Sequence, residues 1–128
     1  MTQGIKYYQD NIAENYYCVG PLNINKKLKR AIMPSGAELE LDDNEFAALD
    51  MLAAHEGQPL AFETIYTAIW QKEDSECVRF TARQALGELM TQVRMIGDGF
   101  IWIEYSLENG YTFRTEWGLK WWVDRDKA

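Results

Sequence analysis

Hydrophobic side chains in the middle of the chain recur every three or four positions, the spacing that one buried face of an α-helix requires. Three segments show this pattern, and we predict helices at residues 44–55, 62–70 and 77–95. The repeating positions are Phe46, Leu49, Leu52 and Ala53 in the first segment, Phe62, Ile65, Tyr66 and Ile69 in the second, and Val78, Ala82, Ala85, Leu86, Leu89 and Val93 in the third.

The first predicted helix has a signal at each end. Asp42 followed three residues later by Glu45 is the capping-box arrangement, in which each side chain satisfies a free backbone N–H of the first turn. Gly57 and then Pro59 end the pattern. His55, the only histidine, lies at this end, where a cation favours the helix dipole. We interpret it as structural, and a histidine-rich metal site is excluded.

Before the first helix the pattern changes to short runs of β-prone residues. We predict strands at residues 16–19, 22–24, 29–33 and 37–41, with a Pro-Ser-Gly turn before the last. Hydrophobic and acidic residues alternate along the last run, as they do in a half-buried strand. These runs predict a small antiparallel sheet.

A strong break, Gly-Asp-Gly at residues 97–99, follows the third helix. Two β-prone runs come next, at residues 100–105 and 111–114, and Asn109-Gly110 between them is the strongest short-range hairpin signal. The sequence therefore predicts a two-stranded hairpin here.

A helix, a turn, further helices and a β-hairpin follow one another in the order of a winged helix-turn-helix, whose last helix enters the DNA major groove. We therefore predict an α+β fold with an N-terminal antiparallel sheet, three helices and a hairpin wing. At 128 residues and 47% hydrophobic the chain suits one domain. We place that domain at residues 16–115, between an N-terminal arm at 1–15 and a Trp-rich tail at 116–128.

These elements resemble the effector domain of OmpR/PhoB-type response regulators, whose N-terminal sheet distinguishes it from other winged helices. The resemblance implies that the third helix is the recognition helix, that residues 71–76 form the loop that can touch RNA polymerase, and that residues 107–111 form the wing tip. No receiver domain precedes the module, which leaves open a free-standing effector and a piece of a longer regulator. The resemblance is carried by residues 41–46, Leu49, Leu52, Gly57, residues 65–70 and residues 110–113.

The resemblance places the outward side chains of the third helix at double-stranded DNA. Arg79 and Arg83 could each bind phosphate or bridge guanine O6 and N7, with secondary contacts from Thr81 and Gln84. The alternative is a solvated helix face that keeps two charges. The predicted DNA-binding set is Arg79, Thr81, Arg83 and Gln84 in the major groove and Arg94 and Arg114 on the backbone.

The charge of the chain opposes this function. The net charge is −7 and the pI about 4.7, whereas affinity for DNA comes largely from Lys and Arg displacing counterions. The segment 31–71 contains no Lys or Arg. Where the family has an Arg near the wing tip this chain has Leu107 and Glu108, and Ala61 replaces the Ser or Thr that caps the second helix.

These departures keep a second hypothesis open, an acidic protein-interaction module, either an adaptor or an inhibitor of a nucleic-acid-binding protein, that has lost DNA binding. A positive stripe around the third helix would support DNA binding, and a mixed or acidic one would support a protein partner. The tail could supply a protein contact through Trp117, Trp121 and Trp122, or pack as an extended core. A homodimer is also possible.

Other features favour structural roles. We interpret the basic cluster at residues 26–30 as a solvated loop, with a phosphate or acidic-protein contact as the alternative. We predict that Cys18 and Cys77 are reduced and structural, because free Cys often behaves as a small buried hydrophobe. No metal, cofactor or catalytic motif appears, so we expect no enzyme. No apolar run is long enough to span a membrane, and we expect a cytoplasmic location.

Overall fold

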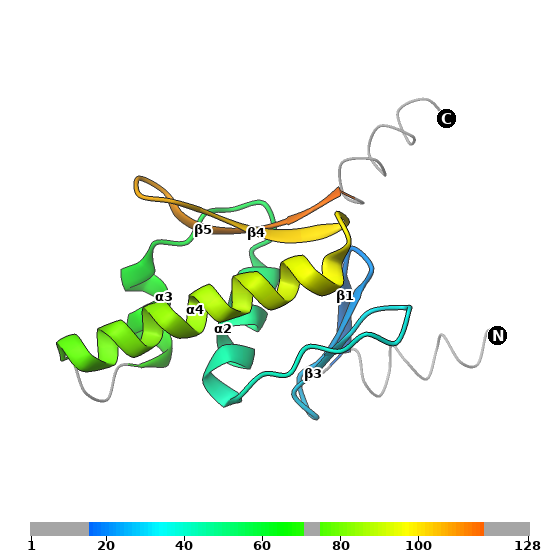
Figure 1. Cartoon of the computed structure of the whole chain (residues 1–128), viewed down its shortest axis with the longest axis horizontal. Helices are drawn as coiled ribbons and strands as arrows, with labels where there is room; N and C mark the ends of the chain where they lie inside the picture. Colours follow the sequence, from blue (N-terminus) through cyan, green and yellow to red (C-terminus); the bar gives the residue numbers. More distant parts are fainter. Residues whose placement is uncertain (1–15, 71–74, 117–128) are drawn as a thin grey trace.

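The computed structural model describes residues 16–70 and 75–116. This part contains two antiparallel sheets, one of three strands and one of two, and three helices between them (Figure 1). The predicted winged-helix architecture is confirmed, whereas the predicted arm and the three tail tryptophans lie outside the described residues. The elements are β1 (Tyr16–Val19), β2 (Leu22–Asn25), β3 (Arg30–Ile32), α2 (Asp43–Ala54), α3 (Phe62–Ile69), α4 (Glu76–Gly97), β4 (Ile101–Ser106) and β5 (Gly110–Thr115).

The helices begin where their capping residues allow. Asp42 accepts a 2.8 Å hydrogen bond from the Glu45 backbone N–H, and Glu45 accepts one of 3.1 Å from the Asp42 N–H, which confirms the capping box. Ser75 Oγ caps α4 by accepting from the Val78 N–H at 3.2 Å. Ala61 precedes α3 without any side-chain cap, as its methyl group requires.

The predicted strand at residues 37–41 is wrong. Only a single bridge joins Glu38 to Ile32, and the chain then leaves the sheet. The side chain of Gln92 on α4 takes the place of a strand, because its amide accepts from the Glu40 N–H and donates to the Glu40 carbonyl, both at 3.0 Å. The alternation itself was real, since Leu39 is buried between two exposed glutamates.

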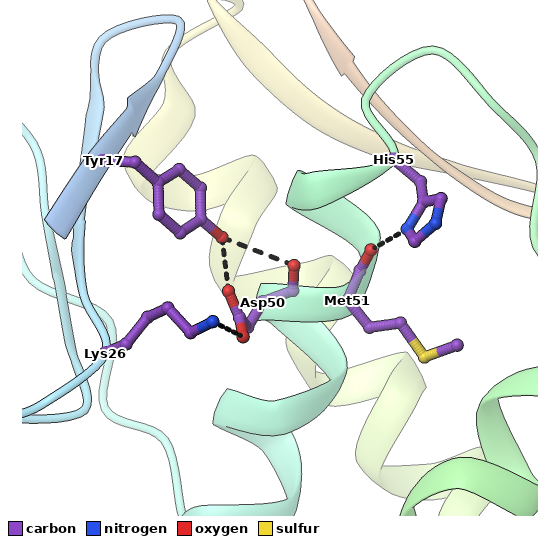
Figure 2. Close-up of polar contacts among 5 residues, drawn as sticks. All are labelled: Tyr17, Lys26, Asp50, Met51 and His55. Atoms are coloured by element: carbon purple, nitrogen blue, oxygen red, sulfur yellow. Dashed lines mark hydrogen bonds and ion pairs between the residues drawn. The ribbon is translucent and has the colours of Figure 1, made fainter. Parts of the chain in front are cut away.

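The sheet β1–β2–β3 is fastened to α2 by one half-buried carboxylate (Figure 2). Tyr17 Oη on β1 donates to Asp50 Oδ1 at 2.6 Å, and Lys26 Nζ lies 3.5 Å from Asp50 Oδ2. Burial and the hydrogen bond to Asp50 raise the pKa of Tyr17. At the end of α2, the ring of His55 places Nδ1 2.8 Å from the carbonyl oxygen of Met51, which confirms its predicted place at the helix end.

The hairpin β4–β5 is fixed to the α2–α3 connection at Gly110. Tyr111 and Leu60 exchange two backbone hydrogen bonds of 2.7 and 2.8 Å. Gly110 has φ +93°, and a Cβ there would lie 2.2 Å from the Leu60 carbonyl oxygen. The predicted hairpin is confirmed, with its turn at residues 107–109 and with Gly110 pairing with Ser106 as the first residue of β5.

A single hydrophobic core joins the two sheets through the helices. Leu49 and Leu52 of α2 contribute to it, as do Leu86 and Leu89 of α4, and all four are at most 1% exposed. Both cysteines are free, as predicted, but the prediction that they are buried is wrong, because Cys18 lies on the outer side of β1 and Cys77 on the exposed side of α4.

Candidate nucleic-acid interface

Helix α4 is the longest element and extends along the molecule (Figure 1). Its N-terminal end, α3 and the tip of the β4–β5 hairpin lie at the end of the molecule opposite the three-stranded sheet (Figure 1). The fold therefore brings together the recognition helix and the wing that the sequence predicted.

Arg79 does not extend freely from α4. Its guanidinium forms an ion pair with Glu63 of α3 through both carboxylate oxygens, the second contact being Nη2 to Oε2 at 3.3 Å. Its ζ-carbon also lies 4.5 Å from the centre of the Tyr66 ring. Arg79 thus bridges α4 to α3.

Arg83, one turn further along, has a different environment. Its ζ-carbon lies 4.0 Å from the centre of the Phe62 ring, and it forms no ion pair within residues 16–70 and 75–116. Phe62 in turn stacks on Tyr66 with 5.5 Å between the ring centres. Both arginines therefore lie along the aromatic edge of α3, on one flank of α4.

The outermost line of α4 carries no charged side chain. Its members follow at spacings of three or four residues, all are exposed, and they lie opposite the buried line Ala82, Leu86, Leu89 and Val93. The two end residues are 61% and 76% exposed, although they are large and hydrophobic. We call this line the α4 crown, and it consists of Phe80, Gln84, Gly87, Thr91 and Met95.

Gln84 of the crown was predicted from the sequence, whereas its two exposed hydrophobic residues, Phe80 and Met95, were missed because outward positions were chosen by polarity. The signal was available at Phe80, which falls outside the stripe that includes Val78 and Ala82. The pairing of Arg79 with Glu63 had no signal, because the two residues belong to different helices.

Hydroxyl groups near the crown are already in use. Thr81 Oγ1 donates to the Cys77 carbonyl at 3.0 Å, and Thr91 Oγ1 donates to the Gly87 carbonyl at 3.1 Å. Each threonine keeps its oxygen as an acceptor and its methyl group for contact.

The other two predicted DNA-binding residues, Arg94 and Arg114, differ in whether they form an ion pair within the described residues. Arg94 is exposed and makes no ion pair with the part of the chain that the structure describes. Arg114 Nε donates to Glu104 Oε2 at 3.1 Å, and Trp102 Nε1 donates to the other oxygen at 3.1 Å. These bonds, first that from Trp102, lower the pKa of Glu104. Leu107 at the wing tip is 92% exposed.

The charges around α3, α4 and the hairpin are therefore mixed rather than uniformly positive. Such a surface supplies only weak general attraction to phosphate. By the criterion set out from the sequence, a mixed surface favours a protein partner, and any DNA binding would have to depend on particular contacts. The acidic residues of this region are Glu63, Glu76, Glu88, Asp98, Glu104 and Glu108, and the basic ones are Arg79, Arg83, Arg94 and Arg114.

The basic cluster at residues 26–30 is mostly neutralised within the fold. Besides the Lys26–Asp50 contact, Lys29 lies 3.1 Å from Asp43, and Arg30 binds Glu38 through two nitrogens at 2.7 and 3.1 Å. These pairs fasten the β2–β3 turn to α2 and to the segment after β3. Only Lys27 and Leu28 of the cluster have no such partner among the described residues.

Other kinds of site have little support. Within the described ranges, no three His, Cys, Asp or Glu side chains are grouped so that they could hold a metal ion. Among the described helices, none combines the length and apolarity that crossing a membrane requires. Residues 71–74 of the predicted polymerase loop lie outside the described part.

Neither a family model nor a curated protein matches the sequence. Solved structures do match its fold. The DNA-binding domain of CpxR from E. coli is 24% identical, with a TM-score of 0.59 over 78% of this chain and 96% of that one. The response regulator DrrB, a Thermotoga maritima OmpR/PhoB homologue, gives 19% identity and a TM-score of 0.63 over 86% of this chain and 49% of its own.

A third match is a structure with DNA. The RstA DNA-binding domain of Klebsiella pneumoniae, solved in complex with the RstA box, is 18% identical, with a TM-score of 0.60 over 77% of this chain and 96% of that one. The predicted resemblance to OmpR/PhoB-type effector domains is thus confirmed at the level of the fold.

Proposed function

We propose that this chain binds double-stranded DNA sequence-specifically and acts in transcriptional regulation. The observation that carries the proposal is the exposed outer face of α4, placed beside a hairpin wing in a fold shared with DNA-binding domains. In this proposal α4 enters the major groove through Arg79, Thr81, Arg83 and Gln84. Arg94 and Arg114 contact the backbone.

The ion pair of Arg79 with Glu63 does not prevent this role. An exposed ion pair contributes only about 0.2–1 kcal/mol, so a phosphate can replace Glu63 as the partner of Arg79 at small cost. Arg83 needs no exchange, because stacking on Phe62 occupies the face of its guanidinium and leaves the N–H groups at its edge for phosphate.

Two consequences follow from the mixed charge. Few phosphates are neutralised, so the loss of affinity with salt should have a shallow slope, equivalent to a few phosphates. A single copy gains little from electrostatics, and affinity therefore depends on two copies binding neighbouring half-sites. A homodimer on DNA is part of the proposal.

The test is selection from random duplex DNA with the purified chain, repeated at rising salt. Enrichment of one motif, reduced at least tenfold in affinity by Arg83→Ala, supports the proposal. Lys27→Ala is the matched control, because it removes one positive charge from an exposed side chain away from α4. Absence of enrichment even at low salt contradicts the proposal.

A second candidate function is the acidic protein-interaction module. The specific observation in its favour is the uncharged α4 crown with exposed Phe80 and Met95, since aromatic residues and Met are enriched in protein interfaces. RNA polymerase contacts through residues 71–76 or the Trp-rich tail belong to the same class of prediction. The DNA selection distinguishes the two functions, because the module predicts no enriched motif.

A further inference from the structure

We propose that the α4 crown recognises A·T base pairs, with Gln84 contacting adenine and Phe80 contacting the methyl group of thymine. This inference rests on the proposed DNA binding and concerns which bases are read. Arginine bridging to guanine, the commonest specific contact in the major groove, would then be absent from the centre of the interface.

The position of the arginines is the first argument. Arg79 and Arg83 lie on the flank of α4 that faces α3, held over the rings of Tyr66 and Phe62. A guanidinium held there lies to the side of the α4 crown. The crown is the part of the helix that would enter the groove most deeply. Each guanidinium is placed to meet the phosphates at the wall of the groove.

Gln84 is the polar crown residue with free hydrogen-bonding capacity. It is exposed and has no hydrogen bond to the described residues, whereas the amide of Gln92 is occupied by the Glu40 backbone. A free carboxamide offers one acceptor and two donors in a plane, which matches the N6 donor and N7 acceptor of adenine.

Phe80 provides an apolar contact one turn before Gln84. Phe80 is 61% exposed and lies on the open side of α4. Four residues of helix rise about 6 Å, which is close to two base-pair steps. A thymine methyl read by Phe80 would therefore lie about two base pairs from the adenine read by Gln84.

Gly87 removes the obstacle between the helix and the bases. A Cβ there would meet nothing within 4 Å, so no neighbour in the fold requires the glycine. Glycine in a helix interior lowers stability relative to alanine. Gln84, Glu88 and Thr91 surround Gly87 on the exposed outer side of the helix, where the edge of the DNA would approach.

The experiment uses the DNA site obtained by selection and changes single atoms of it. Replacing the adenine by 7-deazaadenine removes N7, and we expect about a tenfold loss of affinity. Replacing the thymine by deoxyuridine removes one methyl group, and we expect about a fourfold loss.

The variants assign each loss to a residue. Gln84→Ala should bind the 7-deazaadenine site as tightly as the adenine site, and should still lose affinity when thymine is replaced by deoxyuridine. Phe80→Ala should bind the deoxyuridine and thymine sites equally, and should still lose affinity on the 7-deazaadenine site. Each variant is the matched control of the other, because both change exposed side chains of the same helix. An unchanged melting temperature verifies that both are folded.

Three results would overturn the inference. If the enriched site has G·C pairs that depend on Arg83 and not on Gln84, DNA binding stands and the reading of A·T pairs is wrong. If both variants lose as much affinity as the unmodified protein does on each modified base, neither Gln84 nor Phe80 contacts those bases. If no DNA is enriched at all, the proposed function fails and this inference fails with it.

Discussion

Gly110 at the base of the wing and Gly87 on the α4 crown differ in whether contacts within the fold require glycine there. At the base of the wing, Gly110 has a left-handed backbone and the Leu60 carbonyl oxygen where its Cβ would be. On the α4 crown, nothing occupies the space beside Gly87. The fold therefore explains the first glycine and not the second. The proposed approach of DNA to α4 would give Gly87 a role that its contacts among the described residues do not.

The charged residues repeat this contrast. In the densest basic cluster of the sequence, residues 26–30, three of the four cations form ion pairs, with Asp50, Asp43 and Glu38. On α4, Arg83 lies over the Phe62 ring and forms no ion pair within the described residues. The number of cations in a segment is thus a poorer guide to a ligand surface than the partners those cations already have.

The largest effect should come from the wing base. Gly110→Ala places a methyl group against the Leu60 carbonyl in a strained conformation, and we expect a loss of about 3 kcal/mol or more of unfolding free energy. Chemical denaturation measures it. A loss below 1 kcal/mol would mean that the wing is not fixed to the α2–α3 connection as described.

The next effect concerns the fastening of the sheet to α2. Tyr17→Phe removes a hydrogen bond to a carboxylate and should cost about 1.5–3 kcal/mol. Because the pKa of Tyr17 is raised in the fold, the native state keeps this proton at alkaline pH where the unfolded chain has lost it. Stability that depends on the hydroxyl therefore falls as pH rises above about 10.

Tyr17→Phe should lack that part of the loss of stability at alkaline pH. Thermal melts across pH 8–11, a range around the ordinary tyrosine pKa of about 10, would detect the difference. Tyr105→Phe makes the same chemical change at an exposed ring and should alter stability by less than about 0.5 kcal/mol. Equal effects of the two substitutions would contradict the role of Asp50.

A smaller effect is expected at Glu45, beneath α4. Its side chain is 8% exposed, and Oε2 has no hydrogen-bond partner among the described residues. Burial raises the pKa of this carboxyl above its ordinary value, with Glu88 contributing in the same direction. The folded state therefore holds a proton that the unfolded chain releases, and stability falls as pH rises through that window.

Glu45→Gln keeps the oxygen that caps α2 and removes the buried charge. We expect it to gain about 1 kcal/mol at pH 7 and to reduce the fall of the melting temperature as pH rises above the ordinary glutamate pKa. Glu108→Gln, an exposed residue of the wing turn, is the control and should leave both unchanged. An unaltered pH profile for Glu45→Gln would show that this carboxyl is solvated.

The smallest stability effect has the opposite sign. Gly87→Ala should stabilise the fold by about 0.5–1 kcal/mol, through helix propensity, while weakening binding to the selected DNA site. Gly97→Ala in the same helix should destabilise, because its Cβ would lie 2.8 Å from Ile101. If Gly87→Ala leaves DNA affinity unchanged, the crown does not approach DNA closely.

Much of the fold could be predicted from the sequence because its signals are local. The capping box at Asp42 and Glu45, the stripe of α4 and the Asn109-Gly110 turn each depend on residues within a few positions of one another. Helix periodicity, caps and tight turns are set by such short-range contacts. The order of elements then left the winged helix as the fold.

Only the tertiary structure decided which groups remain available. Gln92 binds the backbone of Glu40, Glu63 forms an ion pair with Arg79, and Asp50 accepts a hydrogen bond from Tyr17. In each pair the two residues are more than 15 positions apart in the sequence. Such partners are brought together by packing, which no local pattern records. The sequence by itself determined the scaffold, its acidic balance and the outermost line of α4, whereas packing determined that α3 holds Arg79 and Arg83 and that the Gln92 amide is occupied.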